Sequence, residues 1–386
     1  MPMSSSIHYL DNHATTQTDP RVVEAMLPFF TERYGNAASN HAHGHDAAEA
    51  VAIARQQVAE LVGADPAEVI FTSGATEANN LALKGVLAVT GDRDHLVTSS
   101  VEHPSVLDPA DRLQRDGFRV ARVAVDATAR IDPGDVMAAI EPETALVSTI
   151  WANNEVGTIN PVAEIAGVCR ERNVLFHTDA VQAVGRVPVD CHDLSIDLLS
   201  LSAHKLYGPK GIGALVVRRG PPRILLRPQI DGGGHEAHLR SGTLPVPLVV
   251  GFGVACQLAQ DSLESESDRL RQLTASFLSR LSVLLNGFTL NGHPTDRLPG
   301  NLHLSFERVD GDALLAGLTR IAVSSGSACT TADPEPSHVL AAMGIPEDLG
   351  RASLRFGLGR FTDSEDIAVA VSEVAETVNR LRRAHR

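Results

Sequence analysis

The chain has 386 residues, of which 43% are hydrophobic, and a formal net charge of −14. This length predicts one large domain and a smaller one. The negative charge argues against a general nucleic-acid-binding surface and against attraction to anionic membranes, and no segment is expected to span a membrane. The four cysteines show no paired spacing, so we expect no metal site and no disulfide framework but a reducing, cytoplasmic setting.

In chain order, a polar turn over 11–16 precedes a helix opened by Asp19 and Pro20, a loop over 34–45 and a helix over 51–62. Short apolar runs, typical of buried strands, then alternate with helical segments. The expected strands are 69–71, 96–97, 120–125, 145–150, 174–176, 194–202 and 213–217, and the helices between them are 77–89, 105–114, 133–140 and 161–172. A helix over 249–285, a shorter α+β segment and a helix over 364–383 follow.

This alternation predicts an α/β fold with a mostly parallel sheet and helices on both faces. In such sheets, ligands bind beyond the carboxyl ends of the strands. Because the pattern changes after about residue 245, we place a large domain at 15–255. A small α+β domain at 1–14 and 256–386 would carry a loop around Cys329.

The stretch 202–211 connects two buried strands and contains Lys205. A lysine at the mouth of a buried strand is desolvated, which lowers its pKa and exposes a neutral amine. Such an amine can form a Schiff base with an aldehyde cofactor, of which pyridoxal phosphate (PLP) is the usual one. For a lone lysine, a charged side chain on a solvated loop is the simpler interpretation. The groups near Lys205 therefore decide between that interpretation and a cofactor site.

Three other strand ends supply the groups that a PLP site needs. The turn from Ser73 to Thr76 opens a helix whose N–H groups could hold a phosphate. His103 could lie against a ring, and the Asp179 carboxylate could keep a pyridine nitrogen protonated. Alone, the turn is a weak signal, the histidine is more often a cap or a hydrogen-bonded loop residue, and a helix cap is a fair alternative for Asp179. Together with Lys205 they predict a PLP site.

The motifs carry a family resemblance as well. They are Asp11-x-x-Ala-Thr-Thr16, Ser73-Gly-Ala-Thr-Glu-Ala-Asn-Asn80, Glu102-His103, Asn153-Asn-Glu-Val-Gly157, His177-Thr-Asp-Ala-Val-Gln182, Ser202 to Gly211, Gly232-Gly-Gly-His-Glu236, Arg240-Ser-Gly-Thr243, Ser324 to Thr330 and Leu354 to Arg360. In this order they resemble the PLP-dependent cysteine desulfurases, the NifS/IscS-like family of class-V aminotransferases, over nearly the whole chain. The segment around Cys329 resembles the class with a longer, mobile catalytic loop.

The resemblance implies a PLP-dependent transferase of fold type I, a homodimer that converts L-cysteine to L-alanine. It also implies a role for each matching residue. Lys205 would bind the cofactor, and Asp179 and Gln182 would contact its ring nitrogen and phenolic oxygen. His103 would stack on the ring face and, together with Lys205, would act as a catalytic residue that moves protons. The phosphate region would be bound by Ala75, Thr76, Ser202, His204 and, from the other subunit, Thr243. Asn36, Asn154 and Arg355 would bind the substrate.

Cys329 is the residue that distinguishes a cysteine desulfurase from a transaminase in this sequence. Its surroundings are small, polar and rich in Gly and Pro, which predicts a mobile loop. A thiolate there could attack the substrate sulfur and carry it away as a persulfide. Cys169, Cys191 and Cys256 are expected to be structural. The acceptor could be an iron–sulfur scaffold, a tRNA-thiolation protein or a DNA-modification protein. No direct contact with nucleic acid is expected.

Two alternatives remain open from the sequence. One is a selenocysteine lyase, which needs less help from a cysteine nucleophile. The other is a catalytically idle subunit with a PLP fold that acts as a docking partner. The presence of Lys205, Asp179 and Cys329 argues against the second alternative.

Overall fold

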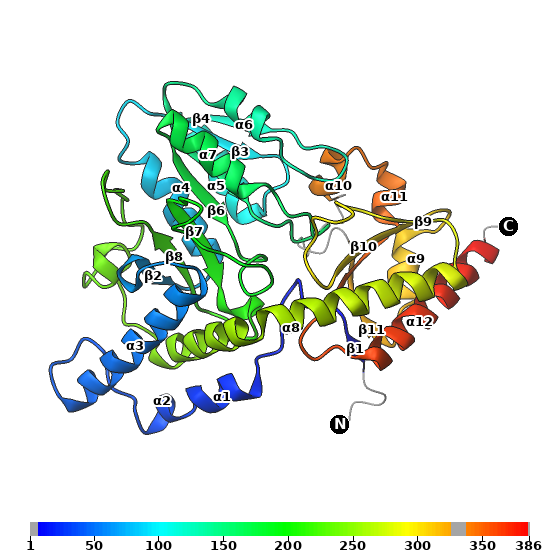
Figure 1. Ribbon diagram of the computed structural model, residues 1–386, viewed down its shortest axis with the longest axis horizontal. Helices are drawn as coiled ribbons and strands as arrows, with labels where there is room; N and C mark the ends of the chain where they lie inside the picture. The colour runs from blue at the N-terminus through cyan, green and yellow to red at the C-terminus, as the bar shows by residue number, and fades with distance from the viewer. Residues whose placement is uncertain (1–6, 326–336, 385–386) are drawn as a thin grey trace.

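Two main sheets joined by one long helix, α8 (Val246–Leu284), form the body of the molecule (Figure 1). The computed structural model describes residues 7–325 and 337–384. Cys329 therefore lies outside the described residues. Every other candidate residue lies within the described ranges.

The larger sheet has seven strands in the order β2-β8-β7-β6-β5-β3-β4. Its strands are β2 (Val69–Thr72), β3 (His95–Ser99), β4 (Arg119–Val123), β5 (Thr144–Ile150), β6 (Leu175–Asp179), β7 (Leu198–Ser202) and β8 (Gly213–Val217). Strands β4, β3, β5, β6 and β7 run parallel, and β8 is antiparallel to both of its neighbours. The predicted α/β fold with a mostly parallel sheet is confirmed.

Helices cover both faces of this sheet because its strands alternate their side chains between two cores. Leu96 packs into one hydrophobic cluster and Val97 into the other, and Leu146 and Val147 do the same in β5. One cluster contains α4 (Ala75–Leu87) and α5 (Pro104–Arg115). The other contains α1 (Pro20–Met26), α2 (Pro28–Thr31), α3 (Ala42–Leu61), α6 (Pro133–Ala139), α7 (Val162–Arg172) and the first half of α8.

The smaller sheet is antiparallel and has its own core. Its order is β12-β13-β10-β9, built from β9 (Phe288–Leu290), β10 (Asn301–Phe306), β12 (Ser324–Ser325) and β13 (Ser353–Gly357). The second half of α8, α9 (Gly311–Ala316) and α12 (Ser364–Ala384) pack on it, and α10 (His338–Ala342) and α11 (Glu347–Arg351) flank it. Near the N-terminus, β1 (His8–Tyr9) pairs in parallel with β11 (Ile321–Ala322).

Helix α8 continues without a break across the boundary predicted at 255/256, and the division into 15–255 and the remaining residues stays a prediction. By length and composition alone, α8 could cross a membrane, so the expectation that no segment qualifies was wrong. Its residues Phe252, Ala255 and Cys256 are fully buried in the core of the larger sheet, where α8 packs along α3.

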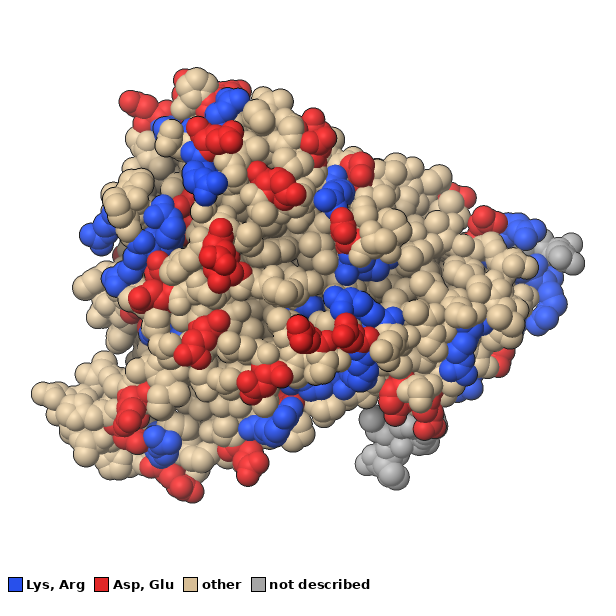
Figure 2. Space-filling model, in the orientation of Figure 1, with Lys and Arg blue, Asp and Glu red and all other residues tan. Residues whose placement is uncertain are grey.

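Two further features concern the surface. Helix α3 begins at Ala42, inside the segment 34–45 expected to be a loop, because the His41 ring accepts a hydrogen bond from the Gly44 N–H and caps it. On the face shown in Figure 2, basic and acidic side chains are interspersed. Exposed ion pairs such as Arg119 with Asp94 (2.7 Å) join opposite charges.

Candidate active site

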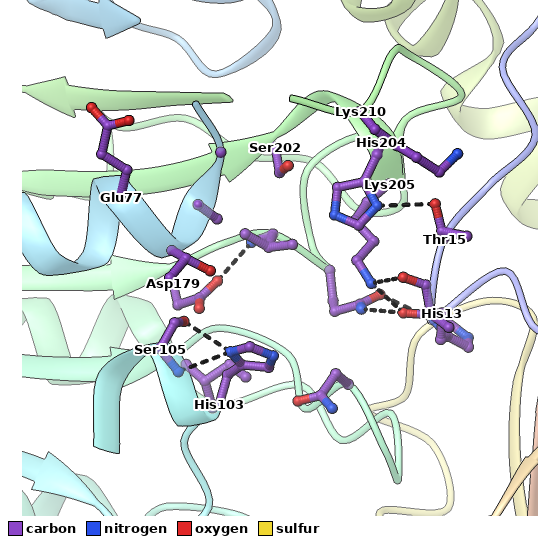
Figure 3. A pocket seen from close by; sticks show the side chains of 18 of the residues that line it. His13, Thr15, Glu77, His103, Ser105, Asp179, Ser202, His204, Lys205 and Lys210 are labelled. Atoms are coloured by element: carbon purple, nitrogen blue, oxygen red, sulfur yellow. Dashed lines mark hydrogen bonds between the residues drawn. The ribbon is translucent and has the colours of Figure 1, made fainter. Parts of the chain in front are cut away.

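A cavity of ≈ 590 Å³ lies beyond the carboxyl ends of the parallel strands, where the sheet rule predicts a ligand site. Side chains from the larger sheet, from residues 11–15 and from β13 line it (Figure 3). The predicted residues among them are Ala75, Thr76, His103, Asn154, Asp179, Gln182, Ser202, His204, Lys205 and Arg355. The structure thus brings together ten residues that span 281 positions of the chain.

Asp179 ends β6 and is only 4% exposed. One carboxylate oxygen accepts a hydrogen bond from Asn79 Nδ2 (2.8 Å), and the other accepts one from the Val181 N–H (3.1 Å). A buried carboxylate held by two donors can stabilise a cationic group placed against it.

Lys205 follows β7 in a short 3₁₀ turn, Ala203–Lys205, and its amine reaches across the cavity toward residues 13 and 14. Its Nζ donates to the carbonyl oxygens of His13 and Ala14, the latter at 2.6 Å. The backbone of the N-terminal segment therefore holds the amine at the cavity wall. This arrangement positions the Lys205 amine beside the same space that Asp179 lines.

The N-terminus of α4 opens into the cavity at Gly74, Ala75 and Thr76. Gly74 has φ +152°, and a Cβ built there would meet nothing within 4 Å, so open space lies in front of it. No side chain caps this helix end. Uncapped N–H groups of the first turn and the helix dipole together attract an anion such as a phosphate.

Gln182 and His13 form a buried pair on the opposite wall. Gln182 Nε2 donates to the His13 carbonyl (3.0 Å), and its Oε1 lies 3.1 Å from His13 Nδ1. Burial holds the pKa of His13 well below its ordinary value, and its Nε2 is buried without a hydrogen-bond partner. His204, whose Nδ1 lies 3.1 Å from Thr15 Oγ1, has its pKa lowered by burial to about 4. Both rings are neutral near pH 7.

Arg355 comes from β13 of the smaller sheet and is 3% exposed. Its Nη2 donates to Asp11 Oδ1 (2.9 Å) and its Nη1 to the Asn154 carbonyl (3.2 Å). Its Nε is buried and has no partner. A guanidinium with an unsatisfied N–H at the cavity wall is suited to bind a carboxylate.

Three predicted residues are not part of this lining. Asn36 is exposed, and its Oδ1 accepts a hydrogen bond from the Ala38 N–H (2.9 Å). Thr243 is exposed as well and does not line the cavity of its own chain. Cys329 lies outside the described residues.

The remaining cysteines are buried, as expected for structural residues. Burial raises the pKa of the Cys169 thiol to about 12 and raises the pKa values of Cys191 and Cys256 as well. Because the thiolate is the reactive form, these three thiols are poor nucleophiles.

The cavity also contains residues that sequence reasoning did not single out. His13 and Asp11 sit within the motif over 11–16, but nothing local shows that this segment crosses the sheet edge. Ser105 and Asn79 contact His103 and Asp179. The available signal for Asn79 was its place on the buried face of an otherwise apolar helix, where a polar side chain requires partners.

Comparison with known proteins agrees with this geometry. The aminotransferase class-V family model matches residues 8–369. A cysteine desulfurase IscS of Anaeromyxobacter dehalogenans is 50% identical over 376 residues, covering 97% of this chain and 93% of its own.

Two solved structures are similar to the whole fold. A NifS-like protein superposes with a TM-score of 0.90 at 35% identity, covering 97% of this chain and 100% of its own. SspA in complex with cysteine gives a TM-score of 0.82 at 36% identity, covering 91% of this chain and 98% of its own. The chain belongs to the class-V aminotransferase family and, within it, to the cysteine desulfurases.

Proposed function

We propose that the chain binds PLP through Lys205 and transfers the sulfur of L-cysteine to Cys329 as a persulfide, which an acceptor protein then receives. The observation that carries the proposal is the convergence of Lys205, Asp179 and Arg355 on one cavity. An amine, a buried carboxylate and a guanidinium with an unsatisfied N–H are the groups that this chemistry requires.

The donor set fits PLP. The uncapped N-terminus of α4, with the open space in front of Gly74, would hold the phosphate together with Thr76, Ser202 and His204. Gln182 would hold the phenolic oxygen, His103 would lie on the ring face, and Thr243 of a second subunit would complete the phosphate region. The exposure of Thr243 in the single chain is compatible with such a contact.

When bound, PLP supplies an aldehyde that joins the substrate amine and a ring that accepts an electron pair from the α-carbon. Asp179 keeps a proton on the ring nitrogen. Arg355 and Asn154 orient the substrate carboxylate. Lys205 Nζ would take the substrate α-proton and return a proton later.

The sulfur step involves one bond formed and one bond broken. The Cys329 thiolate attacks the substrate sulfur, a sulfur–sulfur bond forms, and the carbon–sulfur pair stays with the carbon. That carbon then takes a proton and becomes the methyl group of alanine. The persulfide leaves the enzyme when an acceptor thiol attacks it. An iron–sulfur scaffold, a tRNA-thiolation protein or a DNA-modification protein would serve as the acceptor.

The test measures alanine release from L-cysteine, with dithiothreitol as the acceptor, for the PLP-loaded protein. We expect Cys329→Ser to lose at least about 100-fold in kcat, since removal of a nucleophile eliminates the covalent route. Cys169→Ala is the control and should retain wild-type turnover. Undiminished alanine release by Cys329→Ser would overturn the assigned role of Cys329. The same assay with selenocysteine distinguishes a desulfurase from a selenocysteine lyase.

A further inference from the structure

Four side chains form one continuous hydrogen-bonded chain beneath the cavity. Asn79 Nδ2 donates to Asp179 Oδ2 (2.8 Å) and to Ser105 Oγ (2.8 Å). Ser105 Oγ lies 2.8 Å from His103 Nδ1, and the Ser105 N–H donates to the same Nδ1 (3.1 Å). Asn79 is fully buried and Ser105 is 7% exposed, so water does not compete for these bonds. Figure 3 shows both contacts between Ser105 and His103.

The direction of every hydrogen bond in this chain follows from Asp179. A carboxylate accepts only, so the amide of Asn79 must turn its NH₂ toward it. The second N–H of that group then points at Ser105 Oγ, which has to accept. The hydroxyl proton of Ser105 is therefore directed at His103 Nδ1.

His103 Nδ1 thus faces two donors, the hydroxyl and the backbone N–H of Ser105. A protonated Nδ1 would place a third hydrogen against both of them. The nitrogen is consequently an acceptor, and the single proton of the neutral imidazole lies on Nε2.

We propose that Ser105 and Asn79 are positioning residues that hold His103 as the neutral Nε2–H tautomer. His103 then donates a hydrogen bond through Nε2, and its Nδ1 takes no part in accepting the substrate α-proton, which leaves that proton to Lys205. This narrows the sequence-based expectation that His103 helps to move protons. The consequence for catalysis rests on the proposed function, whereas the tautomer does not.

The charged and titratable groups around His103 are Asp179 from β6, Lys205 after β7, His338 from α10 and Asp108 from α5. Burial lowers the pKa of His103, with Asp179 and Asp108 acting in the opposite sense and Lys205 and His338 in the same sense. The hydroxyl of Ser105 donates to Nδ1 and therefore favours the neutral ring, because a proton on Nδ1 would break this hydrogen bond.

The test uses the PLP-loaded protein without substrate, labelled with ¹⁵N in the histidine rings, and His103→Gln assigns the signals. In the wild type we expect Nδ1 to show the shift of an unprotonated nitrogen and Nε2 that of a protonated one. Ser105→Ala should raise the titration midpoint of His103 by about one pH unit, a tenfold change in proton affinity. Ser105→Thr keeps the hydroxyl and should restore the wild-type midpoint.

Ser148→Ala is the matched control, because Ser148 Oγ lies 2.8 Å from the buried His177 Nδ1 in the same sheet but outside the cavity lining. It should leave the His103 signals unchanged. A protonated Nδ1 in the wild type, or an unaltered midpoint in Ser105→Ala, would overturn the proposal. In cysteine turnover, the acidic limb of kcat/KM should move to higher pH in Ser105→Ala and not in Ser105→Thr. If only the desulfurase assignment were wrong, the protein would not release alanine from L-cysteine, but the ring signals of His103 would still be as expected.

Discussion

The guanidinium of Arg355 donates to the carboxylate of Asp11 at 2.9 Å, although 344 residues separate them in the chain. Ser324 Oγ donates to the other oxygen of Asp11 (2.7 Å), so this carboxylate connects the N-terminal segment to the smaller sheet. Arg355 is thereby fixed at the cavity wall with its Nε still unpaired. Under the proposed function, this N–H would bind the carboxylate of the substrate.

Arg355→Lys should therefore raise the KM for L-cysteine by about 10- to 100-fold, as expected for the loss of charged hydrogen bonds worth about 1.5–3 kcal/mol. Steady-state kinetics of alanine release measure it. Arg360→Lys is the control, since Arg360 is bound to Asp19 (3.0 Å) and Glu266 (2.9 Å) away from the cavity lining. An unchanged KM in Arg355→Lys would remove this residue from substrate binding.

Glu102 makes the stability of the protein depend on pH. Burial raises its pKa to about 8, and its Oε1 accepts hydrogen bonds from Ser99 Oγ and from the Ile150 N–H (2.9 Å). Between the unfolded pKa near 4.5 and about 8, the folded state retains a proton that the unfolded state loses. Stability therefore falls as pH rises through this window, by up to about 1.4 kcal/mol per pH unit.

Glu102→Gln should remove this dependence. The melting temperature of the variant relative to wild type is expected to be higher at pH 8 than at pH 5, because the amide never has to ionise in the core. Thermal unfolding followed by circular dichroism at both pH values provides the measurement. A difference between variant and wild type that stays constant with pH would show that Glu102 does not titrate in this way.

An ion pair between the half-buried Arg55 and the buried carboxylate of Glu236 supports the turn that precedes Thr243. Arg55 donates to both carboxylate oxygens of Glu236, at 2.8 Å and 2.6 Å, and the Phe71 N–H donates to the same carboxylate (2.7 Å). Arg55→Ala leaves this carboxylate buried without its cation, so we expect a loss of about 3–5 kcal/mol in urea unfolding. Arg33→Ala, which breaks the exposed pair with Asp46, should cost less than about 1 kcal/mol. Equal losses in the two variants would contradict this account.

The thiols provide a chemical test of burial. Iodoacetamide reacts with thiolates, and the raised pKa values of Cys169, Cys191 and Cys256 keep them protonated. Intact-mass analysis at pH 7.5 should find no label on these three residues in the folded protein. All four cysteines should react in urea. Labelling of any of the three in the folded protein would show that its pocket opens.

The strand ends of the larger sheet were predictable from the sequence, and with them Lys205, Asp179 and His103. Apolar runs mark the strands, and parallel strands bring their carboxyl ends to one edge. The start of α3 was not predictable, because it depends on the His41 ring acting as a cap. The contact between Asp11 and Arg355 was not predictable either, since it results from packing between distant segments.

The hydrogen bonds of Asn79 and Ser105 within the site could not be predicted from the sequence either. Their neighbours in sequence are ordinary helix residues, and their partners lie on other strands and helices. The family resemblance named residues expected to contact a cofactor and a substrate, but the direction of each hydrogen bond depends on side-chain geometry. The proposed tautomer of His103 could therefore be argued only from the folded arrangement of Ser105 and Asn79 around it.

The walls of the cavity come from residues as far apart in the sequence as Asp11 and Arg355. During synthesis the last wall can form only after Arg355 has been added, even though the seven strands of the larger sheet are all complete by Val217. The complete cavity, and with it the proposed cofactor site, therefore forms later in synthesis than the sheet that supplies most of its residues.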